Sequence, residues 1–295
     1  MGSRFMQAKC AFLGLGVMGF PMAGHLAKKS GAAITVYNRT TEKAQNWCKL
    51  HGGTYAATPK AAAHDQDFVF ACVGNDDDLR AITLGPDGAF HAMKKGAIFV
   101  DHTTASADVA RELANKAAAR GLGFIDAPVS GGQAGAENGA LTVMCGGDQA
   151  TYAKAEPYIM SYARMSKLLG SSGSGQLAKM CNQIAIAGVV QGLAEAIAFG
   201  MKSGLNMEDV IGVISKGAAG SWQMENRHKN MIAEKFDYGF AVDWMRKDLG
   251  ICLAEARKNG STLPVTAIVD QFYADVQAFG GGRWDTSSLI ARLKR

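Results

Sequence analysis

Residues 9–40 are KCAFLGLGVMGFPMAGHLAKKSGAAITVYNRT. An apolar segment leads into a glycine turn, a stretch with the apolar spacing of a helix, a second glycine break and another apolar segment. This order predicts two parallel strands joined by a helix, because parallel strands need a crossover connection. The stretch therefore predicts a βαβ unit.

The same alternation continues along the first half of the chain. Further apolar segments have the length of buried strands, at 67–73, 96–103 and 122–129. Helical stretches such as 106–121 separate them, and one more helix at 149–163 precedes a short strand-like segment at 165–170. Alternation of this kind predicts an α/β fold with a doubly wound, mostly parallel sheet.

Strand signals largely disappear after this point. We therefore predict a boundary near residue 167, between an α/β domain over residues 6–167 and an all-α domain over residues 168–295. The second domain opens on a long apolar stretch in which residues 184–201 could be mistaken for a membrane span. A span needs about 20 residues without charge, and Gln191 and Glu195 interrupt this one. We predict a buried helix at a domain or subunit interface, and no membrane.

Composition narrows the class of protein. The chain has 295 residues, 48% of them hydrophobic, and a formal charge of +5 that is scattered along the sequence. Nucleic-acid binding is not indicated, because basic residues form no cluster. The six cysteines form no CxxC pair and the six histidines lack metal-ligand spacing. Free thiols, a reducing cytoplasm and no metal site are expected.

The glycine turn predicts a cofactor. In a GxGxxG motif the first two glycines permit a tight turn and close approach of a pyrophosphate, and the third lets helix and strand pack closely. Gly14, Gly16 and Gly19 have this spacing. The alternative is a glycine-rich connection without a ligand, but here the motif lies between a predicted strand and helix, as the mechanism requires.

The end of the second strand indicates which dinucleotide binds. An NAD site has an acidic residue that holds the ribose 2′-hydroxyl, whereas a 2′-phosphate favours an arginine. Here Asn38 takes the place of the acid, Arg39 can pair with a phosphate and Thr40 can donate a hydroxyl. NADP(H) is predicted over NAD, the alternative for Arg39 being an exposed loop residue.

Two further segments carry candidate site residues. Backbone amides at Ser130, Gly131 and Gly132 could converge on a carboxylate, or the segment could be a flexible loop. Lys179 opens the long apolar helix, with Asn182 three residues on and hence on the same face. Beside apolar neighbours the pKa of a lysine is lowered, which suits proton transfer near neutral pH. The alternative is a surface lysine.

Four segments in this order resemble the β-hydroxyacid dehydrogenase family: GLGVMGFPMAGHL (14–26), DAPVSGGQAGAENGAL (126–141), GSGQLAKMCNQ (173–183) and MRKDL (245–249). The family contains 3-hydroxyisobutyrate dehydrogenase, tartronate semialdehyde reductase, and glyoxylate and succinic semialdehyde reductases. The resemblance covers nearly the whole chain. It implies that residues 6–167 are an NAD(P)-binding Rossmann domain, that residues 168–295 are an all-α domain for substrate binding and dimerisation, and that the active site lies in the cleft between them.

The resemblance also implies residue roles. The cofactor phosphates would lie on Gly14, Gly16 and Gly19 with Val17 and Met18, and the nicotinamide end on Thr104 and Lys247. The full set of expected cofactor-binding residues adds Leu15, Asn38, Arg39, Thr40 and Val73. The substrate carboxylate would lie on Ser130, Gly131 and Gly132. Lys179 would be the catalytic acid/base and Asn182 would orient the substrate. Trp222 could line the pocket or simply pack in the core, and Asp248 could hold Lys247 or be exposed.

The expected activity is NADP-dependent interconversion of a short 3-hydroxy acid and its semialdehyde, by hydride transfer. The expected partners are a small carboxylate-bearing aldehyde or hydroxy acid and further copies of the chain, as a homodimer or homotetramer. Alternatives are an imine reductase-like enzyme, in which another residue type would replace the lysine, and a non-catalytic dinucleotide-binding scaffold.

Overall fold

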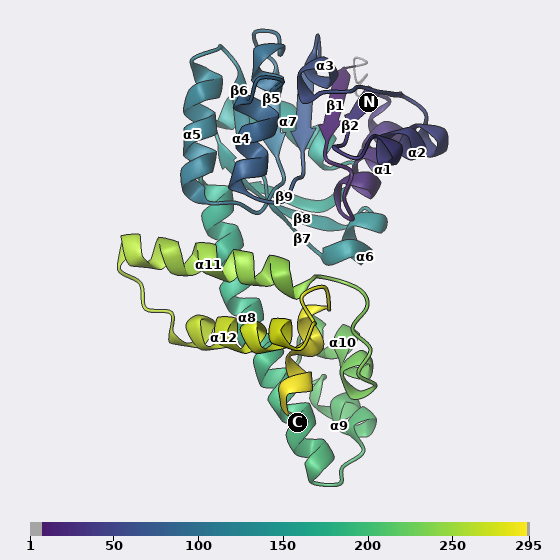
Figure 1. Ribbon diagram of the computed structural model, residues 1–295, viewed down its shortest axis with the longest axis vertical. Helices are drawn as coiled ribbons and strands as arrows, with labels where there is room; N and C mark the ends of the chain where they lie inside the picture. Colours follow the sequence, from purple (N-terminus) through teal and green to yellow (C-terminus); the bar gives the residue numbers. More distant parts are fainter. Residues whose placement is uncertain (1–7, 294–295) are drawn as a thin grey trace. The chain divides into compact units, whose positions relative to one another are not determined.

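The structure, a computed structural model, describes residues 8–293. Residues 6 and 7 of the predicted first domain and residues 294 and 295 of the second lie outside this range. The chain divides into two compact units, Met1–Lys179 (unit 1) and Met180–Arg295 (unit 2). Figure 1 shows the elements of both, coloured along the sequence.

The strands of unit 1 form one mixed sheet. They are β1 (Lys9–Leu13), β2 (Ala33–Tyr37), β3 (Thr54–Tyr55), β4 (Phe68–Ala71), β5 (Ile98–Asp101), β6 (Gly123–Asp126), β7 (Val129–Ser130), β8 (Leu141–Gly147) and β9 (Ala163–Leu168). The order is β3-β2-β1-β4-β5-β6-β8-β7, with β9 paired to β8. The first six of these strands are parallel, in the order of a doubly wound dinucleotide-binding sheet. The predicted α/β class is therefore confirmed.

Helices cover both faces of the parallel sheet. One face packs against α1 (Gly19–Ser30), α2 (Thr41–His51) and α7 (Gln149–Ile159), and the other against α3 (Pro59–Ala63), α4 (Asp76–Leu84) and α5 (Ala107–Ala118). Short α6 (Gly132–Glu137) and the 3₁₀ turn η1 (Ala89–His91) complete the unit.

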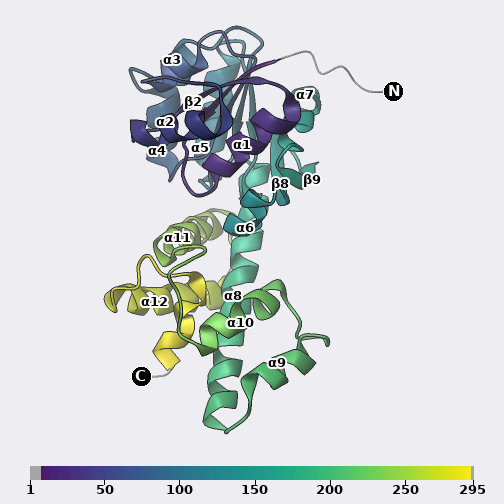
Figure 2. The same cartoon turned by 90° about the vertical axis from the view of Figure 1, so that its right-hand side faces the viewer.

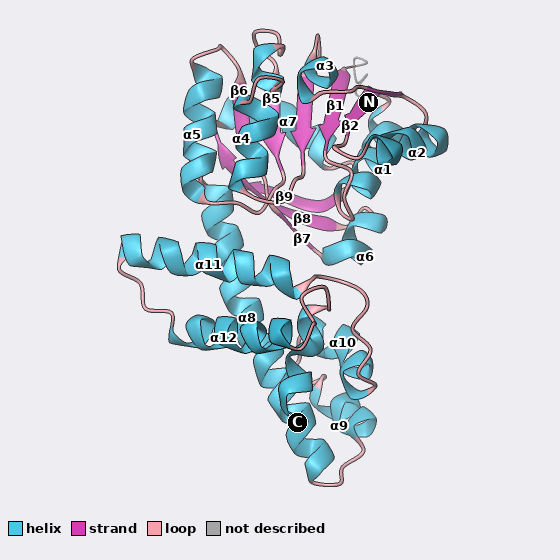
Figure 3. Ribbon diagram, viewed as in Figure 1, coloured by secondary structure: helices cyan, strands magenta, loops and turns pink. Residues whose placement is uncertain are grey.

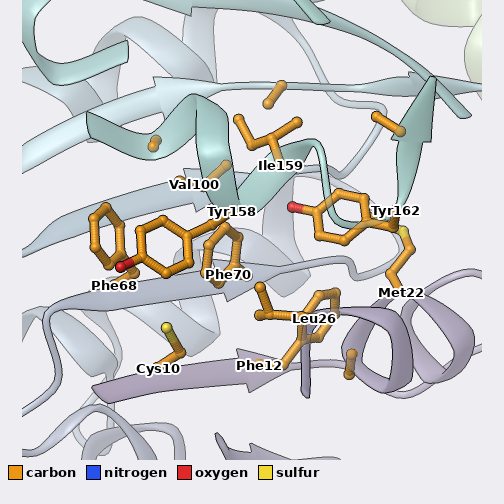
Figure 4. Packing of buried hydrophobic residues seen from close by; sticks show 14 of the residues in the cluster. Cys10, Phe12, Met22, Leu26, Phe68, Phe70, Val100, Tyr158, Ile159 and Tyr162 are labelled. Carbon is orange, nitrogen blue, oxygen red and sulfur yellow. The ribbon is translucent and has the colours of Figure 1, made fainter. Parts of the chain in front are cut away.

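Two apolar clusters hold these layers together, because successive strand residues point to opposite faces. Phe12 and Phe70 belong to one cluster, and their neighbours Leu13 and Ala71 belong to the other. Figure 4 shows the first cluster, in which Tyr158 and the helix α7 pack over the strands. The continuous apolar runs of β4 and β5 follow from burial on both faces.

Unit 2 is helical. It consists of most of α8 (Ser174–Lys202), α9 (Met207–Ile214), α10 (Trp222–Ile232), α11 (Val242–Asn259), α12 (Pro264–Ala278) and η2 (Thr286–Leu293). Beyond Leu168 the described residues contain no strand apart from one isolated bridge between Ala241 and Asp285. Figure 3 shows the strands confined to the earlier part of the chain, and Figure 2 shows α9 and α10 beside the second half of α8.

The helix α8 alone among the described elements has the length and apolar composition of a membrane span, and 44% of its most apolar window is buried. Core helices of soluble proteins meet the same criterion. Gln191 lies within that apolar stretch and donates a hydrogen bond to Glu195 over 2.6 Å. The stretch therefore includes an ionisable group and its polar partner.

Candidate active site

The turn between β1 and α1 contains three glycines, and the space around them differs. Gly14 has a φ of +96°, and a Cβ there would collide with the carbonyl oxygen of Cys72 after β4. A Cβ at Gly19 would collide with the carbonyl oxygen of Gly14. At Gly16 a Cβ would meet no atom within 4 Å. Packing therefore explains Gly14 and Gly19, whereas Gly16 borders open space where a phosphate can approach the backbone.

The other residues of this turn differ in exposure. Leu15 is buried in the sheet core, and Met18 packs against the same cluster. The side chain of Val17 is 57% exposed. The turn thus anchors itself through two apolar side chains and presents backbone and Val17 to solvent, which fits a site that binds phosphates through main-chain amides.

Asn38 follows β2 and ties the turn down. Its Oδ1 accepts a hydrogen bond from the backbone N–H of Leu15 over 2.9 Å, and its Nδ2 donates to the Thr40 carbonyl oxygen over 3.0 Å. The side chain of Arg39 is 88% exposed, with its Nη1 3.5 Å from Oδ1 of Asp78. Asn38 therefore shapes the loop, and Arg39 offers a solvent-facing guanidinium beside it.

The loop after β4 is hydrogen-bonded to the loop after β5. The backbone N–H of Val73 donates to the hydroxyl oxygen of Thr103, after β5, over 3.0 Å. Asn75 caps α4 through its side chain. Asp76 accepts the backbone N–H of Ser106 over 2.9 Å. Asn75 therefore caps α4, and Asp76 links the segments after β4 and β5 at the edge where Rossmann folds bind dinucleotides.

Thr104 is held by a residue that the sequence analysis did not single out. The side-chain amide of Gln176, on α8, donates to the Thr103 carbonyl oxygen over 2.8 Å and accepts the Ala105 backbone N–H over 3.0 Å. Gln176 is fully buried. One side-chain amide thus binds the backbone of both neighbours of Thr104.

Asp126, at the end of β6, caps the start of α8. Its two carboxylate oxygens accept the backbone N–H groups of Gly173 over 2.8 Å and Gln176 over 3.0 Å. Burial raises the pKa of Asp126 to about 6, and the backbone donors oppose that rise. A Cβ at Gly175 would come within 2.6 Å of the Asp126 carbonyl oxygen. Packing, rather than ligand access, therefore explains Gly175.

A second buried carboxyl group lies beside Asp126. Asp101 ends β5 and is paired in register with Asp126. Its Oδ1 accepts the backbone N–H of Thr103 over 2.9 Å. Burial raises the pKa of Asp101 to about 7. In the sequence, each of these groups is indicated by an aspartate at the end of an apolar strand segment.

His102, which follows Asp101, is held by hydrogen bonds within the core. Burial lowers its pKa to about 4, so the ring is neutral near pH 7. Its ring nitrogens lie 2.7 Å from the Ala127 carbonyl oxygen and 2.7 Å from the Tyr162 hydroxyl. Since a carbonyl only accepts, Nδ1 donates to Ala127 and Nε2 accepts from Tyr162. Figure 4 shows Tyr162 among the buried rings.

The Ser130–Gly132 segment joins β7 to α6. Gly131 and Gly132 have φ values of +132° and +62°, which residues with a Cβ rarely adopt. A Cβ at Gly132 would meet no atom within 4 Å. Ser130 is partly exposed, and its carbonyl oxygen accepts the Thr142 hydroxyl over 3.4 Å. The segment has the backbone of an ordered turn with open space beside Gly132.

Lys179 lies on α8, three residues after Gln176, and is only 7% exposed. The alternative of a surface lysine is therefore wrong. Lys179 therefore stays a candidate catalytic residue.

Asn182 and Lys247 are connected within unit 2. Asn182 donates to Oε1 of Gln183 over 2.8 Å, and Gln183 donates to Oδ2 of Asp248 over 2.6 Å. Lys247 Nζ lies 3.0 Å from Oδ1 of Asp248, which is 1% exposed. Asp248 therefore holds Lys247, and Gln183, which the sequence analysis did not assign, links the two predicted site residues.

Trp222 begins α10 and is 50% exposed. The guanidinium of Arg227 lies 4.9 Å from its ring centroid. Core packing is therefore wrong for Trp222, and its exposed face can contact a ligand or another protein surface.

Within residues 8–293 no three His, Cys, Asp or Glu side chains are grouped so that they could hold a metal ion. All six cysteines are free thiols.

The sheet order and the glycine turn define a dinucleotide-binding Rossmann domain, which a helical domain follows. Residues 9–171 match the family profile described as the NAD binding domain of 6-phosphogluconate dehydrogenase. Residues 173–293 match the profile described as NAD-binding of NADP-dependent 3-hydroxyisobutyrate dehydrogenase.

Individual relatives agree with these profiles. An uncharacterized oxidoreductase of Shewanella frigidimarina (strain NCIMB 400) is 65% identical over 98% of this chain and 99% of its own. A probable 3-hydroxyisobutyrate dehydrogenase-like protein of Arabidopsis thaliana, described as mitochondrial, is 39% identical over 98% of this chain and 86% of its own. The structure of Mycobacterium tuberculosis 3-hydroxyisobutyrate dehydrogenase with L-serine has a TM-score of 0.87 and 29% identity, covering 98% of this chain and 100% of that one.

The chain belongs to the 3-hydroxyisobutyrate dehydrogenase-like family of NAD(P)-dependent hydroxyacid dehydrogenases. It is an oxidoreductase that uses a nicotinamide dinucleotide.

Proposed function

We propose that the enzyme interconverts a short 3-hydroxy acid and its semialdehyde, with NADP(H) as the preferred cofactor and Lys179 as the acid/base. The observation that carries the proposal is the burial of Lys179, which is 7% exposed on the α8 turn that follows Gln176. A buried amine, three residues along α8 from the side chain that binds the loop at Thr103 and Ala105, suits proton transfer at a carbonyl oxygen.

Each residue has a separate role in this proposal. When bound, NADPH supplies the hydride that adds to the carbonyl carbon. Lys179 donates a proton to the carbonyl oxygen, and in the reverse direction accepts the hydroxyl proton. Asn182 orients that oxygen. Thr104 and Lys247 contact the nicotinamide end, and the Ser130–Gly132 amides with the Ser130 hydroxyl hold the substrate carboxylate.

The NADP preference rests on the end of β2. Asn38 stands at the position where an NAD site has an acidic residue. Its amide oxygen accepts the N–H of Leu15. Arg39 is 88% exposed and can pair with a 2′-phosphate. Gly16, where a Cβ would meet nothing, leaves space for the pyrophosphate. The remaining cofactor contacts proposed here are Leu15, Val17, Met18, Thr40 and Val73.

The substrate class follows from the groups proposed to hold it. A backbone nest beside a serine suits one carboxylate, and one lysine suits one carbonyl or hydroxyl. Trp222, half exposed at the start of α10, is proposed as a pocket residue. Candidate substrates are therefore small acids with an aldehyde group, such as methylmalonate, tartronate and succinic semialdehydes, together with glyoxylate.

The test is NADPH and NADH oxidation with these aldehydes, for wild type, Lys179→Ala and Lys202→Ala. Lys202 is an exposed lysine at the other end of α8. Lys179→Ala should lower turnover by about 10²- to 10⁴-fold while NADPH binding persists, and Lys202→Ala should match wild type. Retained turnover in Lys179→Ala would overturn the acid/base assignment. Equal catalytic efficiency with NADH and NADPH, or an Arg39→Ala variant with unchanged KM for NADPH, would overturn the cofactor preference.

We also propose that the enzyme works in the cytoplasm as a homodimer or homotetramer. The support is the free state of the cysteines and the exposure of Val189 and Phe199 on α8, at 41% and 73%. Light scattering after size-exclusion chromatography, with Phe199→Glu beside wild type, tests the assembly. A monomeric wild type would contradict it.

A further inference from the structure

The loop after β5 and the first turns of α8 are joined by one buried side chain. Gln176 uses its amide nitrogen for the Thr103 carbonyl oxygen, at 2.8 Å, and its amide oxygen for the Ala105 backbone N–H, at 3.0 Å. These two backbone groups flank Thr104. One side-chain amide thus pairs with two backbone groups, as a neighbouring strand would. It therefore fixes both the position and the direction of the loop.

The same residue is fixed on its own backbone. The N–H of Gln176 donates to Asp126 over 3.0 Å, and that carboxylate also accepts the Gly173 N–H. Asp126 and Gln176 are both fully buried. Because Asp126 ends β6, the start of α8 is attached to the sheet at a strand end and cannot slide without breaking buried hydrogen bonds.

Lys179 follows Gln176 by three residues, which is about 4.5 Å along the helix axis. The two residues therefore share one helix face. Every contact in this chain of attachments, from Thr103 to Lys179, lies within unit 1.

We infer that Gln176 is a positioning residue, whose side-chain amide holds Thr104 in fixed register with the α8 turn that carries Lys179. This rests on the proposed function, in which Thr104 meets the nicotinamide end and Lys179 is the acid/base. Catalytic groups must be held to within fractions of an ångström, and a displacement of about 1 Å can cost about 100-fold in rate. Gln176 itself touches neither substrate nor reacting atoms in this scheme.

The first test is hydrogen exchange in the cofactor-free protein. Gln176→Met keeps the length of the side chain and removes both hydrogen-bonding atoms. The matched control is Gln191→Met, because Gln191 is a buried glutamine of the same helix whose amide nitrogen pairs with Glu195. We expect the Ala105 amide proton to exchange at least about 10-fold faster in Gln176→Met and to be unchanged in Gln191→Met. Unchanged exchange in Gln176→Met would overturn the inference.

The second test separates positioning from a general loss of structure. In Gln176→Met we expect kcat to fall by about 10- to 100-fold, with the Kd for NADPH, measured by fluorescence, within about threefold of wild type. Gln176→Glu lacks the donor when ionised and regains it when protonated. Its kcat relative to wild type should therefore rise at least about fivefold between pH 8 and pH 5.5. A ratio that stays constant with pH, together with turnover like that of Gln191→Met, contradicts the positioning role.

Failure of the proposed function has a different signature. Turnover retained by Lys179→Ala removes Lys179 from the chemistry, whatever Gln176 does. An inactive Lys179→Ala beside a fully active Gln176→Met removes the positioning role alone.

Discussion

The amide oxygen of Asn38 accepts the backbone N–H of Leu15 over 2.9 Å, so a single side chain ties the end of β2 to the glycine turn after β1. The position at which many dinucleotide sites carry an acid for the ribose is occupied here by a residue that shapes the phosphate-binding turn. In the proposed function, discrimination between NADPH and NADH then falls to its neighbours, above all Arg39.

This relationship predicts the behaviour of two variants at one position. Asn38→Ala removes the acceptor for Leu15 and the donor to Thr40, so we expect the free energy of unfolding to fall by about 1–2 kcal/mol and the KM values for NADPH and NADH to rise together. Asn38→Asp keeps the acceptor but adds a negative charge beside Arg39, so the KM for NADPH should rise far more than that for NADH. Steady-state kinetics with both cofactors and urea unfolding measure these effects. A selective loss of NADPH in Asn38→Ala would contradict the tether.

The glycines of the turn should separate into two kinds. Gly16→Ala places its methyl group in open space, so the free energy of unfolding should stay within about 0.5 kcal/mol of wild type, while NADPH affinity falls because the methyl group meets the phosphates. Gly19→Ala collides with the Gly14 carbonyl oxygen and should lose about 1–3 kcal/mol of stability. Urea unfolding and NADPH titration of both variants provide the measurement. Equal stability losses would show that the space beside Gly16 is not free.

In the proposed NADP(H) site, Asp78 would compete with the 2′-phosphate for Arg39. Its Oδ1 lies 3.5 Å from the guanidinium, and such exposed pairs are worth less than about 1 kcal/mol. Asp78→Asn should therefore lower the KM for NADPH by about twofold and leave that for NADH unchanged. Asp77→Asn is the matched control, because Asp77 is a neighbouring acid that pairs with Arg80. An equal effect of both variants would indicate only a change in overall charge.

The buried carboxyl group of Asp101 should make stability fall as the pH rises. Its pKa is about 7 in the folded protein and near 3.9 in an unfolded chain, so between these values the folded state binds a proton that the unfolded state has lost. Raising the pH through this window therefore lowers the free energy of unfolding, by up to about 1.4 kcal/mol per pH unit for this group.

Asp101→Asn does not titrate and keeps an oxygen for the Thr103 N–H. We expect it to gain stability relative to wild type from pH 4 to pH 7, most steeply below pH 7. Urea unfolding of both proteins at pH 5, 6, 7 and 8 measures the difference. Parallel curves for the two proteins would mean that Asp101 is ionised throughout.

The sequence predicted the parallel sheet well because those strands are buried on both faces and appear as continuous apolar runs, as in Phe68–Ala71 and Ile98–Asp101. The sequence analysis did not predict β8. Its residues, Leu141–Gly147, alternate in exposure and follow a glycine-rich segment, which resembles a loop when no partner strand is known. Short β3 and β7 have two residues each and carry no periodicity at all.

Site residues divide in the same way. Local motifs pointed to Gly16, Arg39 and Lys179, because spacing along the chain and residue type carry their signal. Gln176 and Asp126 act through partners 47 or more residues distant in the sequence. No local pattern reveals such partners, since a glutamine in a helix and an aspartate after a strand are both ordinary.

The cap that Asp126 provides for α8 also limits how the chain can be cut. A fragment that ends at residue 167 would contain the buried carboxylate but neither of the N–H groups of Gly173 and Gln176 that satisfy it. It would also leave the Thr103 carbonyl and the Ala105 N–H without the Gln176 amide. A self-sufficient cofactor-binding fragment must therefore carry the start of α8 through Gln176, although these residues belong by sequence to the helical segment that follows. Domain dissection and chimera design should place the junction after Lys179.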